Sequence, residues 1–160
     1  MKTLKTVLCL LMVVTVLTTG CKKDENEGGE GSGKNNYTYL DATTKITEAR
    51  FVIATVFDIR TLSVTLKGEG NSKWVQLHFY KSGTAVPTGT FTYKTNLDGS
   101  YNAATNFAGG NVNLDIASAH EINGGTLNVT KNGDNYTFVL DGKTSRGTVK
   151  ATYTGKVTAQ

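Results

Sequence analysis

The sequence comprises 160 residues with a formal net charge of +4, from 17 lysine and arginine residues against 13 acidic ones. From Tyr37 onward the balance is 12 basic against 9 acidic residues, and the basic residues are scattered singly. The sequence has no block of positive charge that could follow a nucleic-acid backbone, so nucleic acid is not an expected partner. The 124 residues from Tyr37 to Gln160 suffice for one hydrophobic core and not for two.

The first twenty residues have the pattern of a secretory leader. Lys2 and Lys5 precede an uncharged stretch whose apolar centre runs from Val7 to Leu17. That centre is too short for a membrane-spanning helix of about 20 residues and has the length of a signal-peptide hydrophobic region. We therefore expect residues 1–20 to be a signal peptide.

Cys21 directly follows the small residues of "LTTGC". This arrangement resembles the lipobox of bacterial lipoproteins, in which the cysteine thiol takes a diacylglyceryl group, the preceding peptide is cleaved and the new amino terminus is acylated, for example with palmitate. The resemblance implies that Cys21 is the lipidation site and that acyl chains hold the protein on a membrane without crossing it. An ordinary secretory signal with a chance cysteine is the alternative.

Only two cysteines occur, and cleavage would remove Cys9 with the leader. Because Cys21 would then carry lipid, no thiol remains for a disulfide, a zinc cluster or nucleophilic catalysis.

Residues 21–36 comprise this cysteine and a polar tether. From Lys22 to Asn36 no apolar side chain occurs, so nothing offsets the entropy of ordering the chain, and we expect a flexible tether. Its first part, "CKKDENE", resembles the export signal of Bacteroidetes-type surface lipoproteins. That resemblance implies a location on the outer face of the outer membrane; a plain spacer on a periplasm-facing lipoprotein is the alternative.

The tether also contains "GGEGSGKN", which matches the glycines and lysine of a nucleotide-binding loop. Asn35 stands where the magnesium-binding serine or threonine belongs, and a polar linker replaces the buried strand that should precede the loop. We therefore expect no nucleotide and no other cofactor.

From Tyr37 onward, apolar and polar residues alternate with a period of two, which predicts β-strands. No window repeats apolar residues with the spacing of a stable helix. Residues 43–48 fit either a short strand or a turn. The predicted strands are "ARFVIATVFDI", "LSVTL", "KWVQLHFYK", "GTFTYKT", "NVNLDI", "TLNVTK", "NYTFVL" and "TVKATYTGKV".

Tight turns punctuate these strands. "KNGD" at 131–134 is an Asn-Gly hairpin signal, and "LDGS" at 97–100 and "LDGK" at 140–143 are expected Asp-Gly turns. Short strands joined in this way predict an all-β domain over residues 37–160. We expect an antiparallel meander that forms a single β-sandwich or barrel-like domain.

Two segments of the domain, "VPTGTFTY" and "INGGTLNVTKNGDNYTFVLDGKTSRGTVKATYTGKV", resemble small all-β lipoproteins of gut Bacteroidetes. In that group a P-x-G-x-Y/F turn comes in mid-domain and a Gly-Gly hairpin ends in Y-x-G. The resemblance supports the fold and the cellular address but implies no catalytic residues.

Few residues are suited to catalysis or to metal binding. Ser118, His120, Glu121 and Asp115 are close in sequence, but no G-x-S-x-G occurs and the segment fits a polar loop. The only other histidine is His78, and neither H-E-x-x-H nor a calcium loop is present, so no metal site is expected. We expect no histidine within hydrogen-bond reach of a nucleophile, and hence no enzyme.

"WVQLHFY" is the strongest candidate surface. Alternation assigns Val75, Leu77 and Phe79 to the core. The opposite face carries aromatic rings that can stack on sugars or other ring systems, beside an amide and an imidazole that can orient polar groups. The alternative is a second core layer or a cross-strand ladder. The predicted ligand-binding residues on this face are Trp74, Gln76, His78 and Tyr80.

A polar loop expected from Thr95 to Asn113 is the second candidate surface, because loops longer than about 12 residues are often functional. Tyr101 and Phe107 are its isolated aromatic residues and complete the predicted ligand-binding set. An ordinary mobile connection is the alternative.

These patterns together predict a lipid-anchored, non-enzymatic module on the cell surface that binds a glycan or small molecule. The alternative function is a structural or protein-interaction subunit of a surface complex, or an adhesin, that uses a strand edge.

Overall fold

The computed structural model describes residues 35–95, 99–115 and 118–160. All regular elements in these residues are β-strands, so the predicted all-β class is confirmed. The expected signal peptide, the lipidation of Cys21 and the tether up to residue 34 lie outside the described residues. The strands are β1 (Asn36–Tyr39), β2 (Ala42–Val56), β3 (Ile59–Gly68), β4 (Trp74–Tyr80), β5 (Gly89–Tyr93), β6 (Asn106–Phe107), β7 (Gly110–Asn113), β8 (Ala119–Ile122), β9 (Gly124–Asn132), β10 (Asn135–Thr144) and β11 (Gly147–Ala159).

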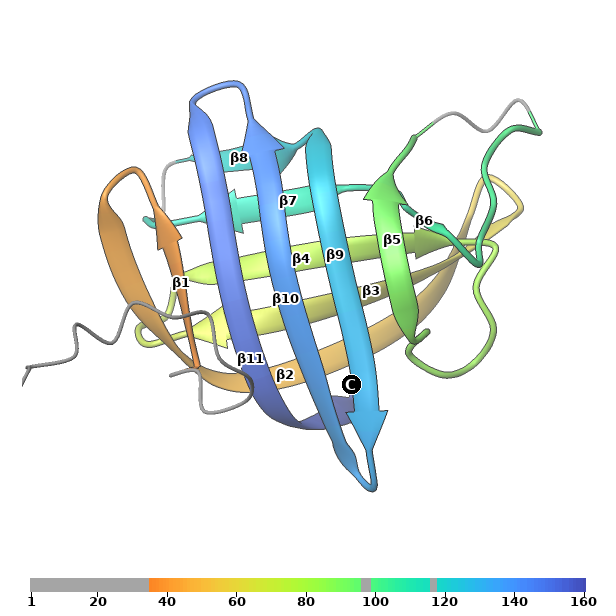
Figure 1. Ribbon diagram of the computed structural model, residues 1–160, viewed down its shortest axis with the longest axis horizontal. Helices are drawn as coiled ribbons and strands as arrows, with labels where there is room; N and C mark the ends of the chain where they lie inside the picture. The colour runs from red at the N-terminus through yellow and green to blue at the C-terminus, as the bar shows by residue number, and fades with distance from the viewer. Residues whose placement is uncertain (1–34, 96–98, 116–117) are drawn as a thin grey trace, which may run out of the picture. The chain divides into compact units, whose positions relative to one another are not determined.

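The described strands form one hydrogen-bonded sheet in the order β6-β5-β9-β10-β11-β1-β2-β3-β4-β7-β8. Two antiparallel meanders, β2-β3-β4 and β9-β10-β11, supply most of it. Figure 1 shows the sheet curled over, so that β9, β10 and β11 cross in front of β2, β3 and β4. The domain is therefore a half-barrel built from one curled sheet.

Two parallel pairings depart from the expected antiparallel pattern. Residues 157–159 of β11 pair with residues 49–51 of β2, and β5 pairs with β6 over two residues. Because β11 also pairs with β1 and β10, it joins the two layers of the half-barrel.

Aromatic side chains fill much of the space between the layers. Phe79 of β4 meets Phe91 of β5 edge to face, with ring centroids 5.3 Å apart. Tyr37 is fully buried, and its hydroxyl donates a hydrogen bond to the backbone oxygen of Asn113 at 2.7 Å. Burying a large apolar side chain contributes about 1.5–3 kcal/mol. This packing fixes the inward side chains of both meanders and thereby decides which side chains point outward.

The predicted turns are correct in part. The Asn-Gly turn is confirmed, since β9 and β10 pair directly on either side of Gly133 and Asp134. The Asp-Gly turn expected in "LDGK" is wrong, because Gly142 lies inside β10 and the chain turns after Thr144. Gly142 is buried, and a Cβ atom there would lie 2.8 Å from Val149 Cγ1, so this glycine serves close packing. The turn expected in "LDGS" falls partly outside the described residues.

The strand expected over "ARFVIATVFDI" is also wrong at its end. Phe57 and Asp58 form a two-residue turn between β2 and β3, with φ angles of 49° and 62°. Positive φ at both central residues is the type I′ geometry of tight hairpins. Residues 43–48, which fitted either a strand or a turn, belong to β2, with a bulge between Ile46 and Glu48.

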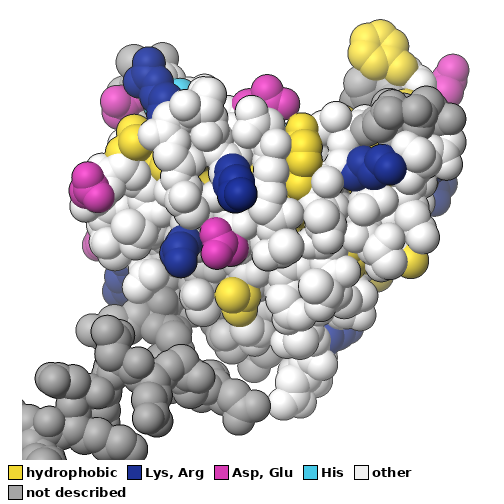
Figure 2. Space-filling model, turned by 45° about the horizontal axis from the view of Figure 1, so that its top comes forward, with side chains coloured by type: hydrophobic (Ala, Val, Ile, Leu, Met, Phe, Trp, Pro, Cys, Tyr) yellow, Lys and Arg dark blue, Asp and Glu magenta, His cyan; other side chains and the backbone are white. Residues whose placement is uncertain are grey.

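The surface is mixed in charge. Figure 2 shows a face on which hydrophobic side chains are few and basic and acidic side chains are interspersed. Exposed ion pairs such as Lys156 with Asp134, 3.3 Å apart, contribute little to stability. Within the described part of the chain, no helix has the length and apolar character needed to cross a membrane.

Candidate functional site

Strand β4 has the two faces that its sequence predicts. Val75, Leu77 and Phe79 are buried, whereas the four side chains that alternate with them are half-buried. Because successive side chains of a strand point to opposite sides, these four lie in one row on the side away from the core. They are Trp74, Gln76, His78 and Tyr80.

Neighbouring strands extend this row into a surface. The register pairs Gln76 with Thr65 of β3 and Asn111 of β7, and it pairs His78 with Ser63. Strand β2 continues the surface on the far side of β3, where Val52 lies opposite Ser63. We call this surface the outer face. Its residues are Glu48, Arg50, Val52, Ala54, Thr61, Ser63, Thr65, Lys67, Trp74, Gln76, His78, Tyr80 and Asn111.

His78 is held by its neighbour on β3. Its Nδ1 atom lies 2.8 Å from the hydroxyl oxygen of Ser63. The expectation that no histidine lies within hydrogen-bond reach of a nucleophile is therefore wrong; cross-strand register brought together two residues that are fifteen positions apart. Burial lowers the pKa of His78 below its ordinary value of 6.5, so the imidazole is neutral at pH 7.

Within the described residues, the Ser63–His78 pair has no carboxylate partner of the kind that completes a catalytic triad. In such a triad a carboxylate orients the imidazole, and backbone N–H groups stabilise the developing oxyanion. Among the described residues, no carboxylate is hydrogen-bonded to the His78 ring. The hydroxyl therefore fixes the ring and leaves Nε2 as the nitrogen that can meet a ligand.

Gln76 is oriented in the same way. Its amide nitrogen donates a hydrogen bond to the Thr65 hydroxyl at 3.3 Å. The amide oxygen and the second N–H group remain available, because they have no partner in the described part of the chain. The middle of the outer face thus presents uncharged hydrogen-bonding groups that neighbouring hydroxyls hold in place.

The two ends of the outer face differ. At one end the Glu48 carboxylate lies 2.9 Å from Arg50 and 3.2 Å from Lys67. The hydrogen bonds from Arg50 and then Lys67 lower the pKa of Glu48. At the other end the ring of Tyr80 packs beside Tyr101, with centroids 5.6 Å apart.

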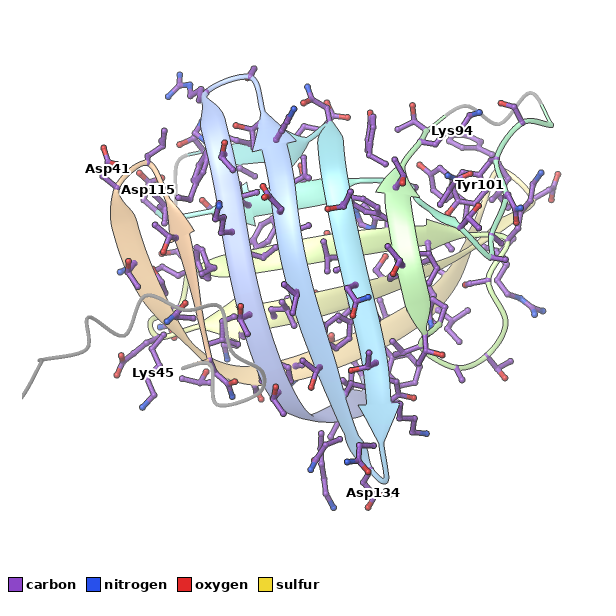
Figure 3. The ribbon with its side chains drawn as sticks, in the orientation of Figure 1. Asp41, Lys45, Lys94, Tyr101, Asp115 and Asp134 are labelled. Atoms are coloured by element: carbon purple, nitrogen blue, oxygen red, sulfur yellow. The ribbon has the colours of Figure 1, made fainter. Side chains whose placement is uncertain are left out.

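Tyr101 and Phe107 are not the isolated loop aromatics that the sequence predicts. Phe107 is fully buried, because β6 pairs with β5 and turns its ring into the core against Tyr93. Tyr101 is only 5% exposed; its hydroxyl donates to the backbone oxygen of Asn106 and accepts from the backbone N–H of Tyr80. Burial also raises the pKa of Tyr101. Neither ring is open to a ligand, and Figure 3 shows Tyr101 at the same end of the domain as Lys94.

His120 lies in β8 and not in a loop, which corrects the expectation for that segment. Its Nδ1 atom is 2.9 Å from the hydroxyl of Tyr39, which is also 3.0 Å from the hydroxyl of Thr144. These contacts tie β8 to β1 and β10. The described residues contain no group of three or more histidine, cysteine or acidic side chains that could hold a metal ion.

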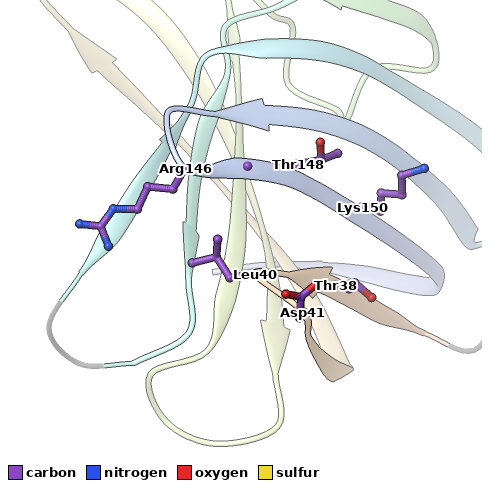
Figure 4. Close-up of a pocket in the computed structure, with 7 residues that line it drawn as sticks. Thr38, Leu40, Asp41, Arg146, Thr148 and Lys150 are labelled. Carbon is purple, nitrogen blue, oxygen red and sulfur yellow. The ribbon is translucent and has the colours of Figure 1, made fainter.

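Sequence reasoning missed a shallow pocket of about 390 Å³ between the β1–β2 turn and the β10–β11 hairpin. Its walls come from segments about a hundred residues apart, so no motif marks it. Figure 4 shows Arg146 and Lys150 extending away from each other, and Lys150 lies 3.8 Å from Asp141. The two cations therefore do not converge on one anion. The lining residues are Thr38, Leu40, Asp41, Arg146, Gly147, Thr148 and Lys150.

No family model, curated protein or solved structure matches this chain. The outer face is the surface on which aromatic and oriented polar groups combine, and it is the best candidate site.

Proposed function

We propose that this protein is a lipid-anchored, non-enzymatic module of the bacterial cell surface that binds a glycan on its outer face. The observation that carries the proposal is the row on β4. Trp74 and Tyr80 flank Gln76 and His78, and the two polar side chains are held by hydroxyls of β3. Oriented polar groups between aromatic rings suit a ligand with both apolar faces and hydroxyl groups.

The charge of this row favours a neutral ligand. Gln76, Thr65 and Ser63 carry no charge, and the lowered pKa of His78 keeps its imidazole neutral at pH 7. The charged residues of the outer face gather at its Glu48 end, where they pair with one another. A sugar supplies hydroxyls that match the free amide and imidazole groups without needing an ion pair.

The spacing favours a chain of sugar units over a single one. Trp74 and Tyr80 are six residues apart on one strand, which corresponds to about 20 Å. A single ring cannot cover two aromatic side chains at that separation. An oligosaccharide lying along β4 can contact both rings and the polar groups between them.

Membrane attachment rests on the sequence of the amino-terminal segment. The small residues before Cys21 and the polar stretch behind it are typical of an acylated, surface-exposed lipoprotein. Metabolic labelling with an alkyne analogue of palmitate tests this part. We expect label on the wild-type protein and none on Cys21→Ser; equal labelling of both would contradict it.

Binding to an array of neutral linear oligosaccharides tests the site. We expect Trp74→Ala to lose most of the binding, because it removes one stacking surface. Val139→Ala is the matched control, since Val139 is an exposed apolar side chain of β10, away from the outer face. An unchanged signal for Trp74→Ala, or no binding by the wild type, would remove the outer face as a glycan site.

A further inference from the structure

Phe57 is the most exposed large hydrophobic residue in the described part of the chain. Its side chain is 94% exposed at the tip of the β2–β3 hairpin, whereas the others of this kind are at most 46% exposed. A single exposed apolar residue is ordinary on a protein surface. The conformation and the neighbours of Phe57 are what make this tip unusual.

The backbone at this tip does not favour phenylalanine. Phe57 and Asp58 have φ angles of 49° and 62°, a geometry that tight hairpins normally build from asparagine, aspartate and glycine. A side chain such as phenylalanine is strained at positive φ. Neither turn preference nor burial accounts for the ring at position 57.

The β1–β2 turn provides an internal comparison. Leu40 and Asp41 have φ angles of 48° and 62°, so the two turns share both their backbone geometry and an apolar residue followed by aspartate. Leu40 is only 45% exposed, and its Cδ2 atom lies close to Gly147 on β11. Leu40 thus has a packing neighbour on β11, whereas Phe57 is almost completely exposed.

Two cations stand at the base of the Phe57 tip. The backbone N–H of Lys81 donates to the backbone oxygen of Arg60 at 2.8 Å, so these exposed residues are neighbours. Neither side chain has an ion-pair partner among the described residues. Lys81 also has a positive φ, of 52°, and the buried hydroxyl of Ser82 has no hydrogen-bond partner in the described part of the chain. Strain and an unsatisfied polar group therefore gather beside the tip.

We propose that the Phe57–Asp58 turn contacts a phospholipid membrane, with the ring of Phe57 in the interface and Arg60 and Lys81 at the lipid phosphates. An aromatic residue at a projecting tip suits a bilayer interface, which needs no matching pocket. Arg60 and Lys81 at the base of the tip are two positive charges against the single carboxylate of Asp58, and lysine and arginine are attracted to anionic headgroups. A protein partner would have to supply an apolar pocket for the ring, which a bilayer interface does not need.

The position of the tip allows it to reach the same membrane as the lipid anchor. The inference rests on the proposed anchoring through Cys21. The chain enters the domain at Asn35, whose backbone oxygen accepts from Ile46 near the start of β2, while Phe57 follows the other end of that strand. Twelve residues of strand separate Lys45 from Phe57, at most about 40 Å. The fourteen residues from Cys21 to Asn35 can span at most about 50 Å, so both contacts can reach one membrane and hold β2 along it.

Tryptophan fluorescence in vesicles tests the contact. The chain from Cys21 onward contains all the described strands and a single thiol, so it can be coupled through Cys21 to a maleimide lipid, whether or not cells acylate it. Phe57→Trp and Leu40→Trp, each combined with Trp74→Phe, place a single tryptophan in one turn or the other. The vesicles contain phosphatidylethanolamine, phosphatidylglycerol and a brominated phospholipid that quenches tryptophan.

We expect blue-shifted emission and quenching by the brominated lipid for Phe57→Trp, and neither for Leu40→Trp. Adding Arg60→Gln and Lys81→Gln should weaken the quenching, as should high salt. Equal quenching in both turns, or an unquenched tryptophan in Phe57→Trp, would overturn the proposal; the second result would leave a protein partner as the occupant of the tip. Because the coupling is chemical, failure here is separate from a failure of Cys21 labelling or of glycan binding.

Discussion

The two faces of β4 show how one strand can serve both folding and binding. On the inner face Val75, Leu77 and Phe79 have almost no exposed surface and pack between the layers. On the outer face the polar side chains bond sideways to β3, through Ser63 and Thr65. Packing therefore fixes the side chains of the inner face. Hydrogen bonds to β3 orient the polar side chains of the outer face and leave some of their donors and acceptors available to a ligand. Substitutions should affect stability on one side and binding on the other.

Phe79→Ala should have the largest effect on stability. The side chain is 1% exposed and packs edge to face on Phe91, so its removal leaves a cavity between the two layers. We expect a loss of about 3–5 kcal/mol in the free energy of unfolding, measured by chemical denaturation. A loss below about 1 kcal/mol would mean that the inner face of β4 is not part of a close-packed core.

Trp74→Ala should change stability far less, although it lies next to the buried Val75. Its half-buried ring lies outside the core, and surface substitutions usually stay within about 0.5 kcal/mol, so we expect a loss of about 1 kcal/mol at most. The same denaturation measurement compares it with Phe79→Ala. A loss as large as that of Phe79→Ala would show that the outer face is a second core layer.

The pH dependence of stability should show the smallest effect. Because the folded state lowers the pKa of His78, the unfolded chain takes up a proton first as the pH falls. The stability contributed by the neutral ring is fully present above about pH 6.5, the ordinary pKa of histidine, and is lost as the pH falls toward the lower folded pKa. Denaturation curves between pH 7 and pH 5 measure this.

His78→Gln is the control for that titration, since glutamine can still hydrogen-bond to Ser63 but does not titrate. The variant should lose most of the pH dependence in this range. Glu48 contributes only near the acid end of this range, because its pKa is lowered in the folded state and the unfolded carboxylate, with its ordinary value of 4.5, begins to take up protons there. The same slope in wild type and His78→Gln would assign the pH dependence to other groups.

Sequence alone could predict most of the strands and the two faces of β4, because both follow from alternation, but the short strands β1, β6 and β8 were not predicted. It could not place the end of β2, since "ATVFDI" continues the apolar pattern through a turn that usually carries asparagine or glycine. At Gly142 the sequence predicted a turn where the strand continues. A glycine after aspartate indicates a turn, but close contact with Val149 explains this glycine. Tertiary packing decided both cases.

The candidate site was predictable only in part for the same reason. The outward row of β4 is local, but its partners Ser63 and Thr65 depend on the register between β3 and β4. The burial of Tyr101 and Phe107 depends on β6 pairing with β5, thirteen or more residues away in sequence. A polar sequence around an aromatic residue does not reveal that its ring enters a distant core.

Chemical-shift mapping of the wild-type domain with a neutral linear oligosaccharide tests the central proposal most directly. If the outer face is the binding site, amide shifts should concentrate in β3, β4 and β7, including Gln76 and His78, and the single indole N–H of Trp74 should move with them. Shifts concentrated at the pocket between Leu40 and Arg146, or no shifts with any oligosaccharide, would contradict it.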